Sequence, residues 1–162
     1  MLRKIILILL VVLIVIQFFH PKKNSSTTVS QNDITLHYTV PDSVHSILKT
    51  ACYDCHSNNT VYPWYNNIQP VAWWLANHVN EGKHELNFSE FAGYAAKKQY
   101  HKLNSIVDSQ RDGWMPLDSY LWIHRNAVLN PQQKQTLMTW ADSLARYIKA
   151  KNNLPDEPKR YD

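Results

Sequence analysis

The sequence is poor in glycine and in cysteine. Its 162 residues include 3 glycines and 2 cysteines, against 6 tryptophans and 9 tyrosines. So few glycines argue against a turn-rich β fold, and the aromatic side chains supply large apolar surfaces for packing. The length leaves room for one domain once the two ends are set aside. The composition therefore predicts a single, mainly helical domain.

An excess of charge of one sign is also missing outside the N-terminus. Four of the 17 lysines and arginines flank the first apolar stretch (Arg3, Lys4, Lys22 and Lys23), which leaves 13 basic against 13 acidic residues. The formal net charge of +4 thus belongs to the N-terminal segment. A basic face for nucleic acid is not supported, and we expect no nucleic-acid partner.

The first 23 residues contain a long apolar run. Arg3 and Lys4 precede an unbroken apolar stretch over residues 5–16. A basic head before an apolar segment is typical of a secretory signal, and no small-x-small cleavage pattern follows it. As a helix, residues 5–19 would measure about 22 Å, so flanking residues would have to snorkel to span a hydrocarbon core of about 30 Å. We expect an uncleaved signal anchor over residues 1–23, forming a single transmembrane helix, in preference to a cleaved peptide.

The rest of the chain divides into a tether, a domain and a tail. Residues 24–40 are expected to be a tether, because residues 20–33 are polar and rich in serine and threonine. Apolar residues alternate from Ile34 to Val40, which predicts an extended segment. The domain would cover residues 41–150, and a flexible tail residues 151–162.

Helix signals recur through the domain. Caps, prolines at first positions and apolar residues at helical spacing predict four helices. These run from Asp42 into Cys52, from Pro70 to about Gly82, from a capping box at Asn87 and Glu90 to before Gly113, and onward from Asn130-Pro131. Residues 57–69 would form an aromatic loop, either a surface turn or a flap against a cofactor.

The motif that carries chemistry is Cys52-Tyr53-Asp54-Cys55-His56. Two cysteines three residues apart on a helical turn face the same side and can reach two vinyl groups of one porphyrin. His56 would then lie beneath that ring, where a neutral imidazole is the usual proximal ligand of iron. The motif therefore predicts one covalently attached haem c, with Cys52 and Cys55 as attachment sites and His56 as proximal ligand.

Other uses of the two cysteines are less well supported. A thioredoxin-like redox pair expects a βαβ context, which is not visible around Cys52. A structural zinc site needs four protein ligands, and there is no second pair of cysteines. A disulfide between Cys52 and Cys55 stays possible, although it would close a very short loop and stabilise little.

The sixth position of the iron has two candidate ligands. Met115 lies in the non-helical sequence Gly113-Trp114-Met115-Pro116, where the following proline limits its freedom, and a methionine opposite a histidine raises the reduction potential. His78 is the alternative, on the apolar face of its helix with Trp74. Met138 is expected to pack inside a helix. Surface positions are expected for His84, His101 and His124.

A family resemblance follows from these residues. The sequence from ACYDCHSNN to LNFSEF (residues 51–91), with the Met115-Pro116 loop, Tyr120, His124 and a final helix, resembles the bacterial haem-binding domain family of c-type cytochromes. The resemblance covers about residues 41–150. It implies one covalent haem per domain, an exported location and electron transfer. Leu117 stands where a second proline is expected after the Met-Pro pair.

Together these patterns predict a membrane-anchored monohaem c-type cytochrome. It would be a small, mainly α, cytochrome c-like domain behind a single N-terminal transmembrane helix, placed in the bacterial cytoplasmic membrane with the haem domain in the periplasm. It would transfer single electrons between unidentified redox proteins and would not be an enzyme. Two alternatives stay open: a haem sensor or small-ligand binder with an easily vacated sixth position, and a peroxidase-like haem enzyme that uses His78 as distal acid or base.

Overall fold

The computed structural model describes residues 1–156, and within them the regular structure is helical, with no strand. The prediction of a mainly α fold is confirmed. The elements are α1 (Leu2–Ile16), α2 (Ile34–His37), α3 (Asp42–Ala51), α4 (Tyr53–His56), η1 (Trp64–Asn67), α5 (Val71–Glu85), η2 (Phe88–Gly93), α6 (Ala96–Asp112), α7 (Asp118–Leu121), η3 (Arg125–Ala127) and α8 (Pro131–Asn152).

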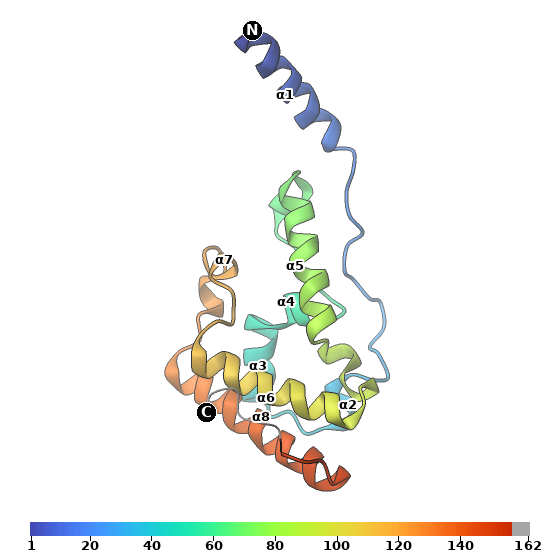
Figure 1. The fold of residues 1–162 in the computed structure, drawn as a ribbon, viewed down its shortest axis with the longest axis vertical. Coiled ribbons are helices and arrows are strands. Elements are labelled where there is room, and N and C mark those ends of the chain that lie inside the picture. Colours follow the sequence, from blue (N-terminus) through green and yellow to red (C-terminus); the bar gives the residue numbers. More distant parts are fainter. Residues whose placement is uncertain (157–162) are drawn as a thin grey trace.

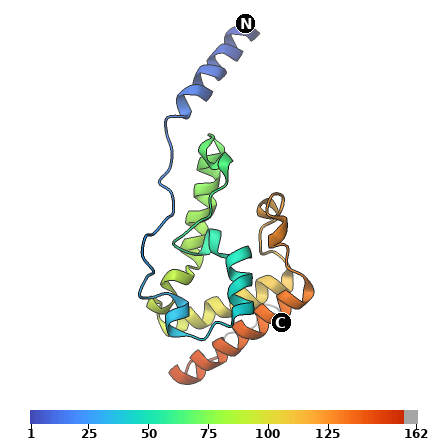
Figure 2. The ribbon, with the colours of Figure 1, turned by 180° about the vertical axis from the view of Figure 1, so that it is seen from behind.

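The core forms where α6 and α8 lie along one another and α3 packs against α8 (Figures 1 and 2). Each helix turns a row of apolar residues at helical spacing towards this centre, which removes that surface from water. The buried residues are Val44, Ile47, Leu48 and Ala51 of α3, Tyr100, Leu103 and Ile106 of α6, and Leu137, Trp140, Ala141, Leu144 and Ile148 of α8.

Helix α8 begins where the sequence predicts. The side chain of Asn130 accepts a hydrogen bond from the Gln133 N–H, and the Gln133 side chain accepts one from the Asn130 N–H, both at 2.9 Å. This reciprocal capping box confirms the predicted start. The helix ends at Asn152, inside the segment expected to be a tail, and residues 157–162 of that tail lie outside the described part of the chain.

Two elements rise from one side of the core (Figure 1). One is α5 together with η1, and the other is the short helix α7. Most of α5 stays accessible, since its buried residues are Ala72 and Val79. The turn α4, called the attachment turn after the haem attachment that the sequence predicts at residues 52–56, follows α3 and packs against α5. The motif Cys52–His56 therefore lies where the core meets this projecting helix.

Residues 17–32 follow the projecting helix as an extended strap (Figures 1 and 2). The Asn24 side chain donates to the Ser57 carbonyl and to Thr60 Oγ1 at 2.9 Å, and Lys83 Nζ donates to Asn24 Oδ1 at 2.6 Å. The Gln17 side chain bonds both the N–H and the carbonyl of Gln69. The polar residues that predict a tether therefore make specific hydrogen bonds to the domain.

Three local predictions are wrong. Residues 34–37 form α2 and not an extended segment, because the Asp33 side chain caps a helical turn by accepting from the Thr35 N–H. Asn87 caps only the short η2, and the long helix begins again at Ala96. Helix α5 passes through Gly82 and ends at Glu85.

The prediction of an N-terminal transmembrane helix is also wrong. Helix α1 has 15 residues, which at 1.5 Å per residue is about 22 Å against the roughly 30 Å of a hydrocarbon core. Within residues 1–156 no helix is both long enough and apolar enough to cross a membrane. The membrane partner and the single-pass location in the cytoplasmic membrane were inferred from that helix, and the orientation with the haem domain in the periplasm from the haem attachment motif. Without a spanning helix in residues 1–156, this membrane location is not supported.

Candidate functional site

The predicted attachment residues lie together on one short turn. Cys52 ends α3 and precedes α4, and its carbonyl accepts hydrogen bonds from the N–H groups of Cys55 at 3.2 Å and His56 at 2.9 Å. Both cysteines are free thiols and partly buried. The structure thus brings Cys52, Cys55 and His56 onto a single turn, as the sequence predicts.

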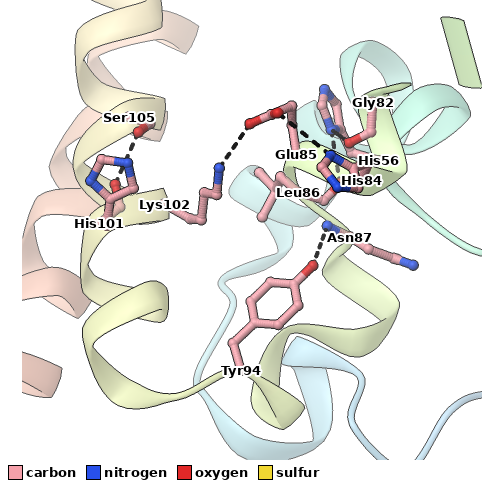
Figure 3. A network of polar contacts seen from close by, with 10 residues as sticks. All are labelled: His56, Gly82, His84, Glu85, Leu86, Asn87, Tyr94, His101, Lys102 and Ser105. Atoms are coloured by element: carbon pink, nitrogen blue, oxygen red, sulfur yellow. Dashed lines mark hydrogen bonds and ion pairs between the residues drawn. The ribbon is translucent and has the colours of Figure 1, made fainter. Parts of the chain in front are cut away.

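The imidazole of His56 is oriented by two backbone carbonyls. Its Nδ1 lies 2.9 Å from the Gly82 oxygen and 2.9 Å from the Leu86 oxygen (Figure 3). Because both partners can only accept, Nδ1 carries the proton, and the lone pair of the neutral ring is on Nε2. Iron-binding histidines typically donate their other N–H to such an acceptor.

The segment that supplies these carbonyls is held in place. Glu85 lies between Gly82 and Leu86 in the sequence. Its carboxylate accepts a hydrogen bond from Lys102 Nζ of α6 at 3.0 Å (Figure 3). The end of α5 is thereby connected to the core. Its last carbonyls also form the negative end of the helix dipole, which favours the imidazole N–H as a partner.

Gly82 allows α5 to approach the attachment turn closely. A Cβ at this position would lie 2.7 Å from the Cys55 carbonyl oxygen and 2.9 Å from the Cys55 Cβ. Only a glycine therefore lets α5 place its carbonyl against His56. Sequence reasoning missed this role, although an isolated glycine in a helical pattern is a sign of close packing.

Burial keeps the three motif side chains neutral. It raises the pKa of the Cys52 thiol to about 12, with the neighbouring Cys55 as a second cause. It also raises the pKa of the Cys55 thiol to about 11, with Asp54 adding to the effect. Burial lowers the pKa of His56, outweighing the carbonyls of Leu86 and Gly82. The imidazole is thus in its ligand form, and the thiols lack the low pKa of a reactive redox pair.

Asp54, between the two cysteines, connects the attachment turn to α7. Its Oδ2 accepts a hydrogen bond from the Tyr120 hydroxyl at 2.8 Å, and its Oδ1 accepts one from the Val61 N–H at 2.9 Å. The Tyr120 ring stacks on His124, with centroids 4.0 Å apart and planes 8° apart. Sequence reasoning named Tyr120 only through the resemblance, expected a surface position for His124, which is partly buried, and gave Asp54 no role.

The two candidate distal ligands lie on different elements. Met115 is partly buried between α6 and α7, and its carbonyl accepts a hydrogen bond from Gln110 Nε2 at 3.2 Å. His78 lies on α5, with Nδ1 2.9 Å from the Trp74 oxygen and its ring 4.3 Å from the Trp74 ring. Among the contacts of the described residues, neither side chain has a hydrogen bond or ring contact to Cys52, Cys55 or His56.

Large aromatic side chains remain open on the two projecting elements. Trp64 and Trp74 of the α5 side are 76% and 46% exposed, and Trp122 beside α7 is 68% exposed. Each of these side chains leaves a large apolar surface that a bound apolar group could cover. Cys52 and Cys55 offer two free thiols on one turn, and the His56 imidazole has its Nε2 available for a metal. These three residues, together with the exposed tryptophans, fit a covalently held haem.

Comparison with known families agrees with this chemistry. The model of the haem-binding domain family matches residues 11–143, which is most of the chain. The chain therefore belongs to the haem-binding domain family, and its cofactor is haem. No curated protein and no solved structure matches the chain.

Proposed function

We propose that this protein is a monohaem c-type cytochrome that carries single electrons and is not an enzyme. The observation that carries the proposal is the position of His56. Its Nδ1–H is fixed on the Gly82 and Leu86 carbonyls, while the free thiols of Cys52 and Cys55 occupy the same turn. A pair of thiols and an oriented imidazole are the two requirements of covalent haem attachment.

The thiols supply the covalent attachment. Each S–H would add across one vinyl group of the haem, so that a sulfur–carbon bond would form and the proton would go to the other vinyl carbon. The addition needs neither an oxidant nor a reductant. Since Cys52 and Cys55 lie on one turn without a disulfide, both are available for it.

His56 would hold the haem iron through Nε2. The two carbonyl acceptors fix the plane of the ring and raise the basicity of the coordinating nitrogen. The haem itself supplies the one-electron chemistry, and the protein contributes orientation, burial and axial ligation.

Met115 is our proposed distal ligand, with His78 as the alternative. The Met115 backbone is held by Gln110, and the following segment is bonded to the attachment turn through Tyr120 and Asp54. A thioether in this position would raise the reduction potential, which suits an electron carrier.

The test is a pair of optical spectra of the matured protein, oxidised and reduced, with Met115→Ala, His78→Ala and Met138→Ala beside the wild type. We expect the oxidised wild type to show the weak far-red band of methionine-to-iron charge transfer. Only Met115→Ala should lose this band and lower the potential, and Met138→Ala serves as the matched control. If His78→Ala alone changes the spectrum, the assignment of Met115 is wrong.

The carrier function is tested separately from the ligand. A carrier with a filled sixth position should bind carbon monoxide slowly in the reduced state and should show no peroxide turnover at enzymatic rates. Fast binding of carbon monoxide would favour a sensor, and peroxide turnover would favour a haem enzyme. Either result would contradict the proposal.

A further inference from the structure

The hydrogen bond between Tyr120 and Asp54 joins two parts of the chain that the proposed function brings to the same cofactor. Asp54 belongs to the attachment turn, and Tyr120 follows Met115 by five residues. We propose that this hydrogen bond is a latch that holds the Met115 segment against the attachment turn. Tyr120 and Asp54 would then be positioning residues for the sixth iron ligand. The inference rests on the proposed function.

The Asp54 side of the latch is fixed without Tyr120. Its Oδ1 accepts a hydrogen bond from the Val61 N–H at 2.9 Å, and its carbonyl accepts one from Thr60 Oγ1 at 2.6 Å. The second carboxylate oxygen, Oδ2, is left for the Tyr120 hydroxyl at 2.8 Å. A carboxylate held in this way is a rigid acceptor, and a hydrogen bond to a charged group is about twice as strong as a neutral one.

The Tyr120 side is rigid as well. The Tyr120 N–H donates to the Leu117 carbonyl at 2.9 Å at the start of α7. The ring stacks on His124, whose Nδ1 lies 3.1 Å from the backbone carbonyl oxygen of Tyr120. The ring that carries the hydroxyl is therefore fixed relative to α7. Because of this, a shift of Tyr120 would also move the residues after Met115.

Apolar packing holds this segment only in part, because Tyr120 and Leu121 contact the core from partly buried positions. None of the α7 residues is buried, and Trp122 and Ile123 are 68% and 61% exposed. The segment is attached at one end by Gln110, which is 5% exposed and bonds the Met115 carbonyl, and at the other by the fully buried Ala127. Segments with so few buried contacts open readily, so one strong hydrogen bond near the middle has a large effect on opening.

Tyr120→Phe tests the latch because it removes the hydroxyl and keeps the ring. In the oxidised haem protein we expect the methionine charge-transfer band to weaken. Exogenous imidazole should bind at least tenfold faster, since loss of a charge-assisted hydrogen bond raises the open population by roughly this factor or more. Tyr147→Phe is the matched control, because Tyr147 is an exposed tyrosine of α8.

Asp54→Asn and the double variant separate positioning from a general loss of stability. Asn has one acceptor oxygen for the two donors Val61 N–H and Tyr120 O–H, so it should also speed imidazole binding. If the two residues act through one bond, the double variant should bind imidazole little faster than the more affected single variant. Additive effects of the two substitutions would overturn the latch.

Amide hydrogen exchange of residues 113–124 in the haem-free full chain gives a readout that does not depend on the iron. Exchange should be faster in Tyr120→Phe than in Tyr147→Phe. If the wild type lacks the methionine band, Met115 is not the distal ligand. The difference in amide exchange between Tyr120→Phe and Tyr147→Phe would then decide whether the latch exists. If the wild type has the band and Tyr120→Phe changes neither the band, the rate of imidazole binding nor the amide exchange, the latch alone is overturned.

Discussion

Burial of Cys52, Cys55 and His56 favours one kind of chemistry at this turn. The thiols of Cys52 and Cys55 have raised pKa values and His56 a lowered one, in each case chiefly because burial disfavours the charged form. A thiol–disulfide catalyst needs the opposite, a stabilised thiolate. The electrostatics of the turn therefore favour covalent attachment and metal binding over redox exchange by the thiols.

Slow alkylation of the thiols follows from their pKa values. In the folded, haem-free chain at pH 7, iodoacetamide should react with Cys55 roughly a hundredfold and with Cys52 roughly a thousandfold more slowly than in the urea-unfolded chain, because the thiolate fraction falls tenfold per pKa unit and burial raises these pKa values from 9.0 to about 11 and about 12. Mass spectrometry of quenched samples measures both rates. Equal rates in the folded and unfolded chain would contradict the burial argument.

His56 should make the stability of the haem-free chain depend on pH. Its imidazole protonates near pH 6.5 when unfolded but only at lower pH when folded, so the unfolded state binds more protons in that interval. The free energy of unfolding should therefore decrease as the pH falls below about 6.5. Urea titrations of the wild type and His56→Asn measure this, and the variant should lack that part of the decrease. An NMR pKa of His56 at or above 6.5 would contradict it.

At Gly82 of α5, helix propensity favours a larger residue, whereas packing against the attachment turn requires glycine. As an interior residue of a helix, glycine is about 1 kcal/mol less favourable than alanine. A Cβ there would nevertheless meet the Cys55 backbone at 2.7 Å, and overpacking of this kind costs about 1–3 kcal/mol. The steric term should win, because a backbone carbonyl cannot move aside as a flexible side chain does.

Gly82→Ala should accordingly lower the free energy of unfolding by up to about 2 kcal/mol, which is the steric cost less the gain of about 1 kcal/mol from the better helix propensity of alanine. It should also disturb the hydrogen bond from His56 to the Gly82 carbonyl. Asn80→Ala, at an exposed position of the same helix, is the control and should be neutral or slightly stabilising. Urea unfolding measures both variants, and a stabilised Gly82→Ala would show that α5 and α4 do not pack as described.

The strap over residues 17–32 can be tested at Asn24. The Asn24→Ala substitution removes side-chain hydrogen bonds to Ser57, Thr60 and Lys83, and should cost about 1.5–3 kcal/mol. Amide exchange over residues 20–30 should become faster, whereas Ser25→Ala, at an exposed position, should leave it unchanged. Random-coil exchange of this segment in the wild type would restore the flexible tether that the composition predicts.

The sequence predicts those parts of the molecule that local chemistry determines. The capping box at Asn130, the end of α6 at Gly113 and the meeting of Cys52, Cys55 and His56 on one turn depend on neighbours a few residues apart. Gly113 ends α6 because it adopts a positive φ of 75°. Such features are visible in a single stretch of sequence.

The remaining features depend on contacts between distant segments. The alternation from Ile34 to Val40 predicts extended chain, but Asp33 caps a turn that buries Ile34 in the core. The hydrogen bond from Tyr120 to Asp54 spans 66 residues, and the strap is fixed by partners such as Lys83, 59 residues from Asn24. No local pattern contains these pairs, so neither the latch nor the ordered strap could be predicted.

The most direct test of the account is the intact mass of the matured protein under denaturing conditions. We predict the mass of the chain plus one haem, still bound after acid–acetone extraction. The haem should be lost on extraction when both Cys52 and Cys55 are replaced by serine. A mass equal to the chain alone, with haem removed by extraction from the wild type, would contradict covalent attachment through Cys52 and Cys55.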